Sequence, residues 1–133
     1  MKFSLSLALA ATVALAPGCG DDDPTAPSDG VRYGADVQPI FSASCTPACH
    51  SGATPNGGLD LTPGNSHGEL VGVAALGYPG YERVVAGDAG ASLLYLKLVG
   101  DPGVGNRMPL SGSLDSLRID TVRRWIDEGA RND

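Results

Sequence analysis

The chain has 133 residues, of which 42% are hydrophobic, and it carries a formal net charge of −6. This length suits one domain, and the hydrophobic fraction is sufficient for a folded core. Nine basic residues face 15 acidic ones and form no cluster, which argues against nucleic-acid binding. The 19 glycines and 10 prolines predict long loops between short elements.

Residues 1–18 have the pattern of an export signal. A lysine at position 2 precedes a mostly apolar run over residues 3–16, which is too short to span a bilayer. The following Leu-Ala-Pro-Gly-Cys sequence resembles a bacterial lipoprotein signal, in which Cys19 becomes the lipidated first residue of the mature chain. Cleavage by the ordinary signal peptidase after Ala16 is the alternative, although the proline that follows disfavours it.

Residues 19–30 are predicted to be a disordered acidic tether, because aspartate, proline and small polar residues cannot bury enough surface to order themselves. A lipid anchor on Cys19 would hold the domain at the periplasmic side of a bacterial membrane. Ordinary cleavage would instead give a soluble periplasmic protein. The folded domain is expected to span residues 31–131.

The first predicted helix covers Asp36 to about Ser44, with Val37, Ile40 and Phe41 on one face. It leads into the most informative segment of the chain, Cys45-Thr46-Pro47-Ala48-Cys49-His50.

Two spaced cysteines followed at once by a histidine are typical of c-type haem attachment. The thiols bond to the porphyrin vinyl groups, and the imidazole ligates the iron. The usual spacing has two residues between the cysteines, whereas this chain has three. The motif predicts one covalent haem c, with Cys45 and Cys49 as attachment sites and His50 as the proximal iron ligand.

Short elements and loops are predicted between His50 and Met108. In the loop over 50–61, a backbone carbonyl is expected to accept the second ring N–H of His50. The further segments are a weak helical turn over 65–73, a turn over 77–80, an extended piece at 84–85, a helix over 88–98 and a loop over 100–105.

Met108 is the candidate for the second axial ligand. It is the only methionine besides Met1, and Pro109 favours an extended loop that could lay the thioether across the distal haem face. A buried gap-filling methionine is the alternative. His67 could replace Met108 and give a bis-histidine haem, although an exposed histidine at a helix start is the simpler interpretation. Arg107, Tyr78 and Tyr81 are candidate partners of the haem propionates, against surface or packing roles.

The last predicted helix begins after Asp115, a candidate N-cap, and ends at Gly129. Its apolar stripe consists of Ile119, Val122 and Ile126. Trp125 adjoins the stripe and is expected in the core, with a hydrogen-bond partner for its indole N–H. The consecutive arginines at 123 and 124 predict a solvated helix face.

In this order the segments resemble small bacterial monohaem cytochrome c domains, similar to class I cytochromes c. The segments that carry the resemblance are residues 36–41, 45–50, 84–88, 92–98, 107–109 and 125–130. The resemblance implies an all-α, class I cytochrome c-like fold with short helices around one covalently attached haem and long Gly/Pro-rich loops. It implies that the first and last helices cross beside the haem. It also implies thioether bonds at Cys45 and Cys49, proximal His50 and distal Met108.

The sequence contains no catalytic set, so the expected function is single-electron transfer to redox partner proteins of the cell envelope rather than catalysis. A haem sensor or gas-binding module with a labile distal ligand is the alternative. Two interpretations without haem also stay open. One is a structural or binding lipoprotein with a Cys45–Cys49 disulfide. The other is a zinc site formed by both cysteines, His50 and His67.

Overall fold

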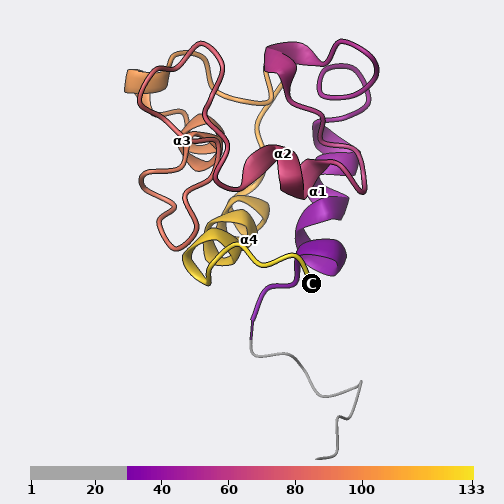
Figure 1. Cartoon of the computed structure of the whole chain (residues 1–133), viewed down its shortest axis with the longest axis vertical. Helices are drawn as coiled ribbons and strands as arrows, with labels where there is room; N and C mark the ends of the chain where they lie inside the picture. The colour runs from indigo at the N-terminus through magenta and orange to yellow at the C-terminus, as the bar shows by residue number, and fades with distance from the viewer. Residues whose placement is uncertain (1–29) are drawn as a thin grey trace, which may run out of the picture.

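Residues 30–133 are described by the structure, a computed structural model (Figure 1). The expected export signal, the lipidated Cys19 and nearly all of the tether lie outside these residues. The described part is mostly helical and contains no β-strand. Its α-helices are α1 (Gln38–Ser44), α2 (Ser66–Leu70), α3 (Leu93–Val99) and α4 (Ser116–Asp127). Between residues 30 and 133, no helix is both long and apolar enough to cross a membrane.

The N-terminal helical segment consists of a π-helix, η1 (Tyr33–Val37), that continues directly into α1. Pro39 lies in the first turn of α1, where its missing N–H leaves no hydrogen bond unmade. The predicted apolar face is confirmed, since Val37, Ile40 and Phe41 are all buried. The helical segment begins at Tyr33 rather than at Asp36.

The prediction for α4 is confirmed at both ends. The Asp115 carboxylate accepts a hydrogen bond from the backbone N–H of Arg118 at 2.9 Å, which caps the first turn. Gly129 follows the helix with φ +103°, a conformation that favours glycine. Trp125 is buried, and its indole N–H donates to the carbonyl of Arg131 at 2.9 Å.

The two ends of the domain pack against each other, because η1 contacts α4 (Figure 1). Their contact includes the rings of Tyr33 and Trp125, whose centroids lie 4.9 Å apart. On another side, α4 also packs against α3. Helix α4 therefore joins the start of the domain to its middle, and it contributes Val122, Trp125 and Ile126 to the common core.

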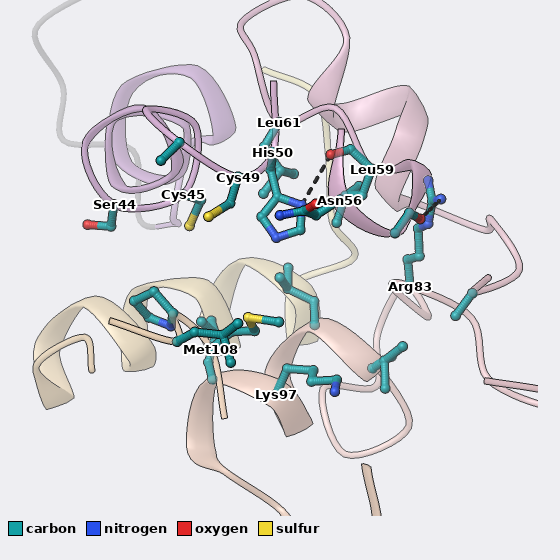
Figure 2. A pocket seen from close by; sticks show the side chains of 18 of the residues that line it. Ser44, Cys45, Cys49, His50, Asn56, Leu59, Leu61, Arg83, Lys97 and Met108 are labelled. Atoms are coloured by element: carbon teal, nitrogen blue, oxygen red, sulfur yellow. Dashed lines mark hydrogen bonds between the residues drawn. The ribbon is translucent and has the colours of Figure 1, made fainter. Parts of the chain in front are cut away.

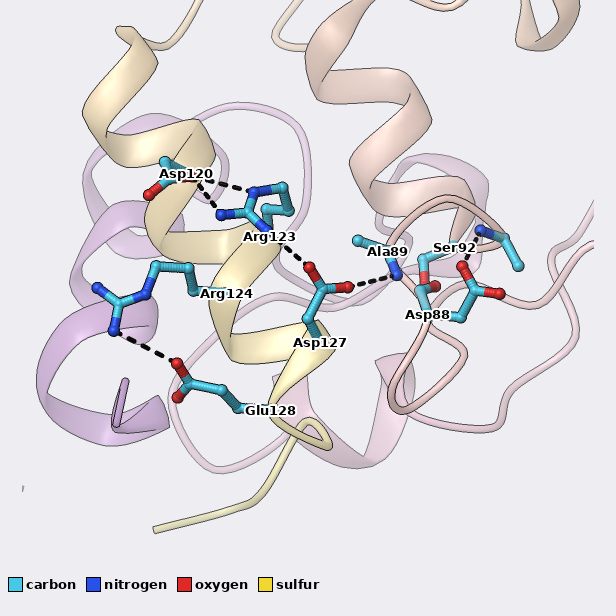
Figure 3. Close-up of polar contacts among 9 residues, drawn as sticks. Asp88, Ala89, Ser92, Asp120, Arg123, Arg124, Asp127 and Glu128 are labelled. Atoms are coloured by element: carbon cyan, nitrogen blue, oxygen red, sulfur yellow. Dashed lines mark hydrogen bonds and ion pairs between the residues drawn. The ribbon is translucent and has the colours of Figure 1, made fainter. Parts of the chain in front are cut away.

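The solvent face of α4 consists of ion pairs, as the consecutive arginines predicted (Figure 3). Arg123 pairs with Asp120 at 2.7 Å and with Asp127 at 2.8 Å, and Arg124 pairs with Glu128 at 3.3 Å. Asp127 also accepts a hydrogen bond from a loop backbone N–H, that of Ala89, at 3.0 Å.

The middle of the chain differs from the prediction at the start of α3. Helix α3 begins at Leu93 and not at Asp88, because residues 88–92 form a turn of their own. In that turn the Asp88 carboxylate accepts from Ala91 N at 2.9 Å, and the Ser92 hydroxyl donates to Asp88 O at 2.7 Å. The predicted extended piece at 84–85 is confirmed by isolated bridges from Val84 and Val85.

Two short 3-10 helices complete the element order. They are η2 (Asn56–Gly58), in the loop after the cysteine motif, and η3 (Pro102–Val104), inside the segment predicted as a loop before Met108. Helix α2 is shorter than the predicted turn over 65–73, because Val71 is already extended and pairs with Val84.

Candidate functional site

A cavity of about 570 Å³ lies between the segment that follows α1 and the segment formed by α3 and the loop after it. Most of the side chains that line it are apolar. They come from five parts of the chain, residues 43–50, 56–61, 75–83, 93–98 and 108–111. The cavity therefore brings together the cysteine motif and Met108, which are far apart in the sequence.

One wall of the cavity contains Cys45, Cys49 and His50. Figure 2 shows the two sulfur atoms side by side, with the imidazole of His50 next to them. The three residues between the cysteines fit into a wide turn, closed by a hydrogen bond from the backbone N–H of His50 to the carbonyl of Cys45 at 3.1 Å. A second bond, from the Ser51 hydroxyl to Thr46 O at 2.7 Å, braces the same turn.

The imidazole of His50 is held through its Nδ1 atom, which lies 3.2 Å from the carbonyl oxygen of Leu59. A carbonyl only accepts, so this contact requires Nδ1 to carry the proton and leaves the lone pair on Nε2. No hydrogen bond among residues 30–133 involves Nε2, and the ring lies against the cavity in Figure 2. The expectation that a carbonyl in the loop over 50–61 fixes this histidine is thus confirmed.

The loop that carries Leu59 is held by a buried arginine. Arg83 donates from Nη2 to the carbonyl oxygens of Gly58 at 2.9 Å and Gly57 at 3.3 Å. Its Nη1 forms an ion pair with Glu69 at 2.7 Å, and the Arg83 side chain is only 10% exposed. Arg83 therefore joins the loop of His50 to α2, and the ion pair compensates its buried charge.

Met108 lies on the opposite wall, where Figure 2 shows its thioether across the cavity from His50. It is not helical, as Pro109 predicted, and its backbone N–H donates to the carbonyl of Lys97 in α3 at 2.9 Å. The guanidinium of Arg107 donates to Leu98 O at 2.8 Å. These two bonds fasten the loop against α3 and fix the position of Met108.

The two thiols differ in their surroundings. Both are free, but Cys49 is exposed whereas Cys45 is partly buried and packs against the core. Burial, and to a smaller extent the neighbouring charge of Cys49, raises the pKa of Cys45 to about 11. Cys45 is therefore held as a neutral thiol at neutral pH.

His67 lies elsewhere in the domain. Its Nε2 is 2.8 Å from the carbonyl oxygen of Ala130, and its ring meets those of Tyr33 and Trp125 edge-on, with centroids 5.0 Å and 6.0 Å away. His67 is half-buried rather than exposed, and it does not line the cavity. In residues 30–133, no group of three or more His, Cys, Asp or Glu side chains is placed to hold a metal ion.

The polar residues of the cavity agree only in part with those expected from the sequence. Of the three suggested propionate partners, Tyr78 lines the cavity, whereas Arg107 and Tyr81 do not. Lys97 and Arg83 line it without having been predicted. Helical spacing could have indicated Lys97 as a cavity residue. It shares one face of α3 with three leucines that line the cavity, Leu93, Leu94 and Leu98.

Comparison of the chain with protein-family models, with curated proteins and with solved structures gave no match.

Proposed function

We propose that this chain is an exported monohaem cytochrome c that carries single electrons at the periplasmic side of a bacterial membrane. The observation that supports this proposal is one arrangement. His50 and Met108 lie on opposite walls of an apolar cavity, and Cys45 and Cys49 line it beside His50. These four residues would hold a c-type haem, with the thiols as attachment sites and His50 and Met108 as iron ligands.

The cavity suits a large apolar group. Its volume is within the range of about 300–1,000 Å³ that is typical of sites for cofactors and other small molecules. Leu76 and Leu110 line it and are 70% and 67% exposed. Exposed leucines at a cavity favour a bound apolar group that would cover them.

Each site residue has one role in this proposal. Cys45 and Cys49 would form the thioether bonds, His50 would hold the iron through Nε2, and Met108 would hold it through sulfur. Haem, when bound, supplies a one-electron redox couple. The carbonyl of Leu59 holds the His50 ring and makes Nε2 the ligating atom. If both His50 and Met108 held the iron, no position would remain for a substrate, and this favours an electron carrier over an enzyme.

The finer fold assignment belongs to the same proposal. A class I cytochrome c-like fold is supported by the packing of the first helical segment, η1 with α1, against the last helix, α4. It is also supported by the order in which the cysteine motif, α3 and Met108 follow one another along the chain.

The environment is proposed from the sequence alone. Cys19 would carry the lipid anchor, and the acidic segment after it would be the tether. The proposed partners are redox proteins of the cell envelope. Cys19→Ser should release the mature protein from washed membranes. A protein that remains on the membrane after this change would contradict the anchor without affecting the haem proposal.

The decisive experiment is the mass and visible spectrum of the protein produced in cells with c-type haem maturation. We expect a mature chain heavier by one haem, a sharp α-band on reduction and an oxidised methionine–iron charge-transfer band that Met108→Ala abolishes. A chain without haem and lighter by two hydrogens would indicate a Cys45–Cys49 disulfide and contradict the proposal. Strong carbon monoxide binding by the reduced protein would indicate a sensor instead.

A further inference from the structure

The cavity has a charge that is opposite to that of the chain. The protein contains 15 acidic and nine basic residues, yet within the described range no carboxylate lines the cavity, whereas Lys97 and Arg83 do. A cation beside an apolar space is stabilised when an opposite charge lies next to it. This distribution favours a ligand that is apolar and also carries acidic groups.

The cations and the thiols lie at different ends of the cavity. Figure 2 shows Cys45 and Cys49 at one end, Lys97 and Arg83 toward the other, and His50 and Met108 between them. A ligand attached at the thiols would therefore direct its far edge toward the cations.

Lys97 is the cavity cation that has no carboxylate partner among the described residues, although its ammonium lies 4.4 Å from the centroid of the Tyr78 ring. Arg83 is neutralised by Glu69, but no carboxylate within residues 30–133 forms an ion pair with Lys97. The Lys97 ammonium donates to the Tyr78 hydroxyl at 2.5 Å and to the carbonyl of Asn106 at 3.4 Å. An ammonium has three donors, so one remains. The Tyr78 hydroxyl also has no acceptor among the described residues.

We propose that Lys97 and the Tyr78 hydroxyl bind a carboxylate of the cavity's ligand, on the edge of the ligand that lies away from the thiols. This inference rests on the proposed function in one respect, the identity of the ligand. The propionates of haem lie on the edge of the porphyrin opposite its vinyl groups, and this matches the separation of Lys97 from the thiols. The recognition of a carboxylate does not depend on the ligand being haem, because it is inferred from the charge and position of Lys97.

The test compares two porphyrins that differ only in their acidic groups. The mature chain, made without haem attachment, is titrated with haemin and with haemin dimethyl ester while the fluorescence of Trp125 is recorded. Trp125 is the only tryptophan, so the quenching comes from a single fluorophore. We expect Lys97→Met to weaken haemin binding about tenfold and to leave ester binding unchanged, since a charge-assisted hydrogen bond is lost with haemin alone. Lys97→Arg should retain most of the preference.

Arg124→Met is the matched control, because it removes the same charge from the solvent face of α4. It should leave both affinities unchanged. The inference is overturned if Lys97→Met weakens both porphyrins equally, if it weakens neither, or if the unmutated chain does not prefer haemin to its ester.

A second measurement needs no mutation. Lys97 is the only lysine besides Lys2, so reductive methylation of the mature chain reports this side chain. We expect Lys97 to be methylated more slowly with haemin bound than with the ester bound, and equal rates would overturn the inference. Failure of the proposed function gives a different result. The matured chain would then lack a haem mass, whereas the preference for a carboxylate over its ester would persist.

Discussion

Arg83 donates to the carbonyl oxygen of Gly58 at 2.9 Å, and the next residue along the chain, Leu59, provides the carbonyl that holds His50. The side chain that fixes the loop and the imidazole that the loop orients are thus linked through two adjacent peptide groups. Arg83 can be buried there because its charge is paired with Glu69 at 2.7 Å. The orientation of His50 therefore depends on a residue outside the cysteine motif.

Replacing Arg83 should disturb both the stability and the histidine. We expect Arg83→Gln to lower the free energy of unfolding by about 2 kcal/mol, because several hydrogen bonds of a buried guanidinium are lost. In the haem-bearing protein it should also shift the paramagnetic NMR signals of the His50 ring. Glu69→Gln is the control, since it weakens the ion pair but leaves the bonds to Gly57 and Gly58. Equal NMR shifts in the two variants would show that the loop contacts do not orient the ring.

His67→Ala tests whether this histidine has any part in iron ligation. His67 bonds to the carbonyl of Ala130 and packs against Tyr33 and Trp125. Because the variant loses these contacts, we expect its free energy of unfolding to be lower by about 1 kcal/mol. The visible spectrum and the methionine–iron band should be unchanged. Under the bis-histidine alternative the unmutated protein would lack that band, and His67→Ala would change the visible spectrum and raise the reduction potential.

The terminal helices were predictable because their signals are local. Asp115 and Gly129 mark the ends of α4, and Pro39 is tolerated only near the start of a helix. The start of α3 was predicted wrongly for an equally local reason. The side chains of Asp88 and Ser92 bond to nearby backbone groups and form a turn, which competes with the helix.

The set of residues that line the cavity was predictable only in part. The chemistry of an imidazole required an acceptor for Nδ1, but only the packed loop identifies it as Leu59. Lys97 lies among leucines, and whether their shared face meets solvent, core or a cavity depends on α1 and the Met108 loop. Arg83 contacts residues that are distant in sequence, and no local pattern marks such a residue.

Cys45 should make the haem-free chain less stable in alkali. The folded-state pKa of about 11 exceeds the ordinary value of 9.0, so the unfolded chain releases this proton at lower pH than the folded chain does. Stability from this group is complete below about pH 9 and is lost as the pH rises through about 11. Urea unfolding at several pH values would measure the decline.

Cys45→Ala is the control for that experiment, because it removes this thiol and leaves every other ionisable group in place. We expect the alanine variant to lose less stability than the unmutated chain between about pH 8 and about pH 10.5. Parallel stability curves would contradict the assigned burial of Cys45. In the haem-bearing protein the thioether cannot titrate, and the difference should disappear.

Substitution of Gly100 should affect the position of Met108, the proposed iron ligand, in addition to straining the backbone. It ends α3 with φ +78°, and a Cβ there would lie 3.0 Å from Cδ and 3.3 Å from Cβ of Arg107. Gly100→Ala therefore combines backbone strain with displacement of the residue that precedes Met108. We expect it to weaken or abolish the methionine–iron band, in addition to lowering the free energy of unfolding by more than about 1 kcal/mol.

Gly87→Ala provides the matched comparison, because Gly87 has φ +87° and nothing lies within 4 Å of a Cβ built there. It carries the same backbone penalty, about 1 kcal/mol, without a steric contact. We expect the methionine–iron band of this variant to equal that of the unmutated protein. If both alanine variants keep the band and lose the same stability, the packing of Arg107 against Gly100 does not position Met108.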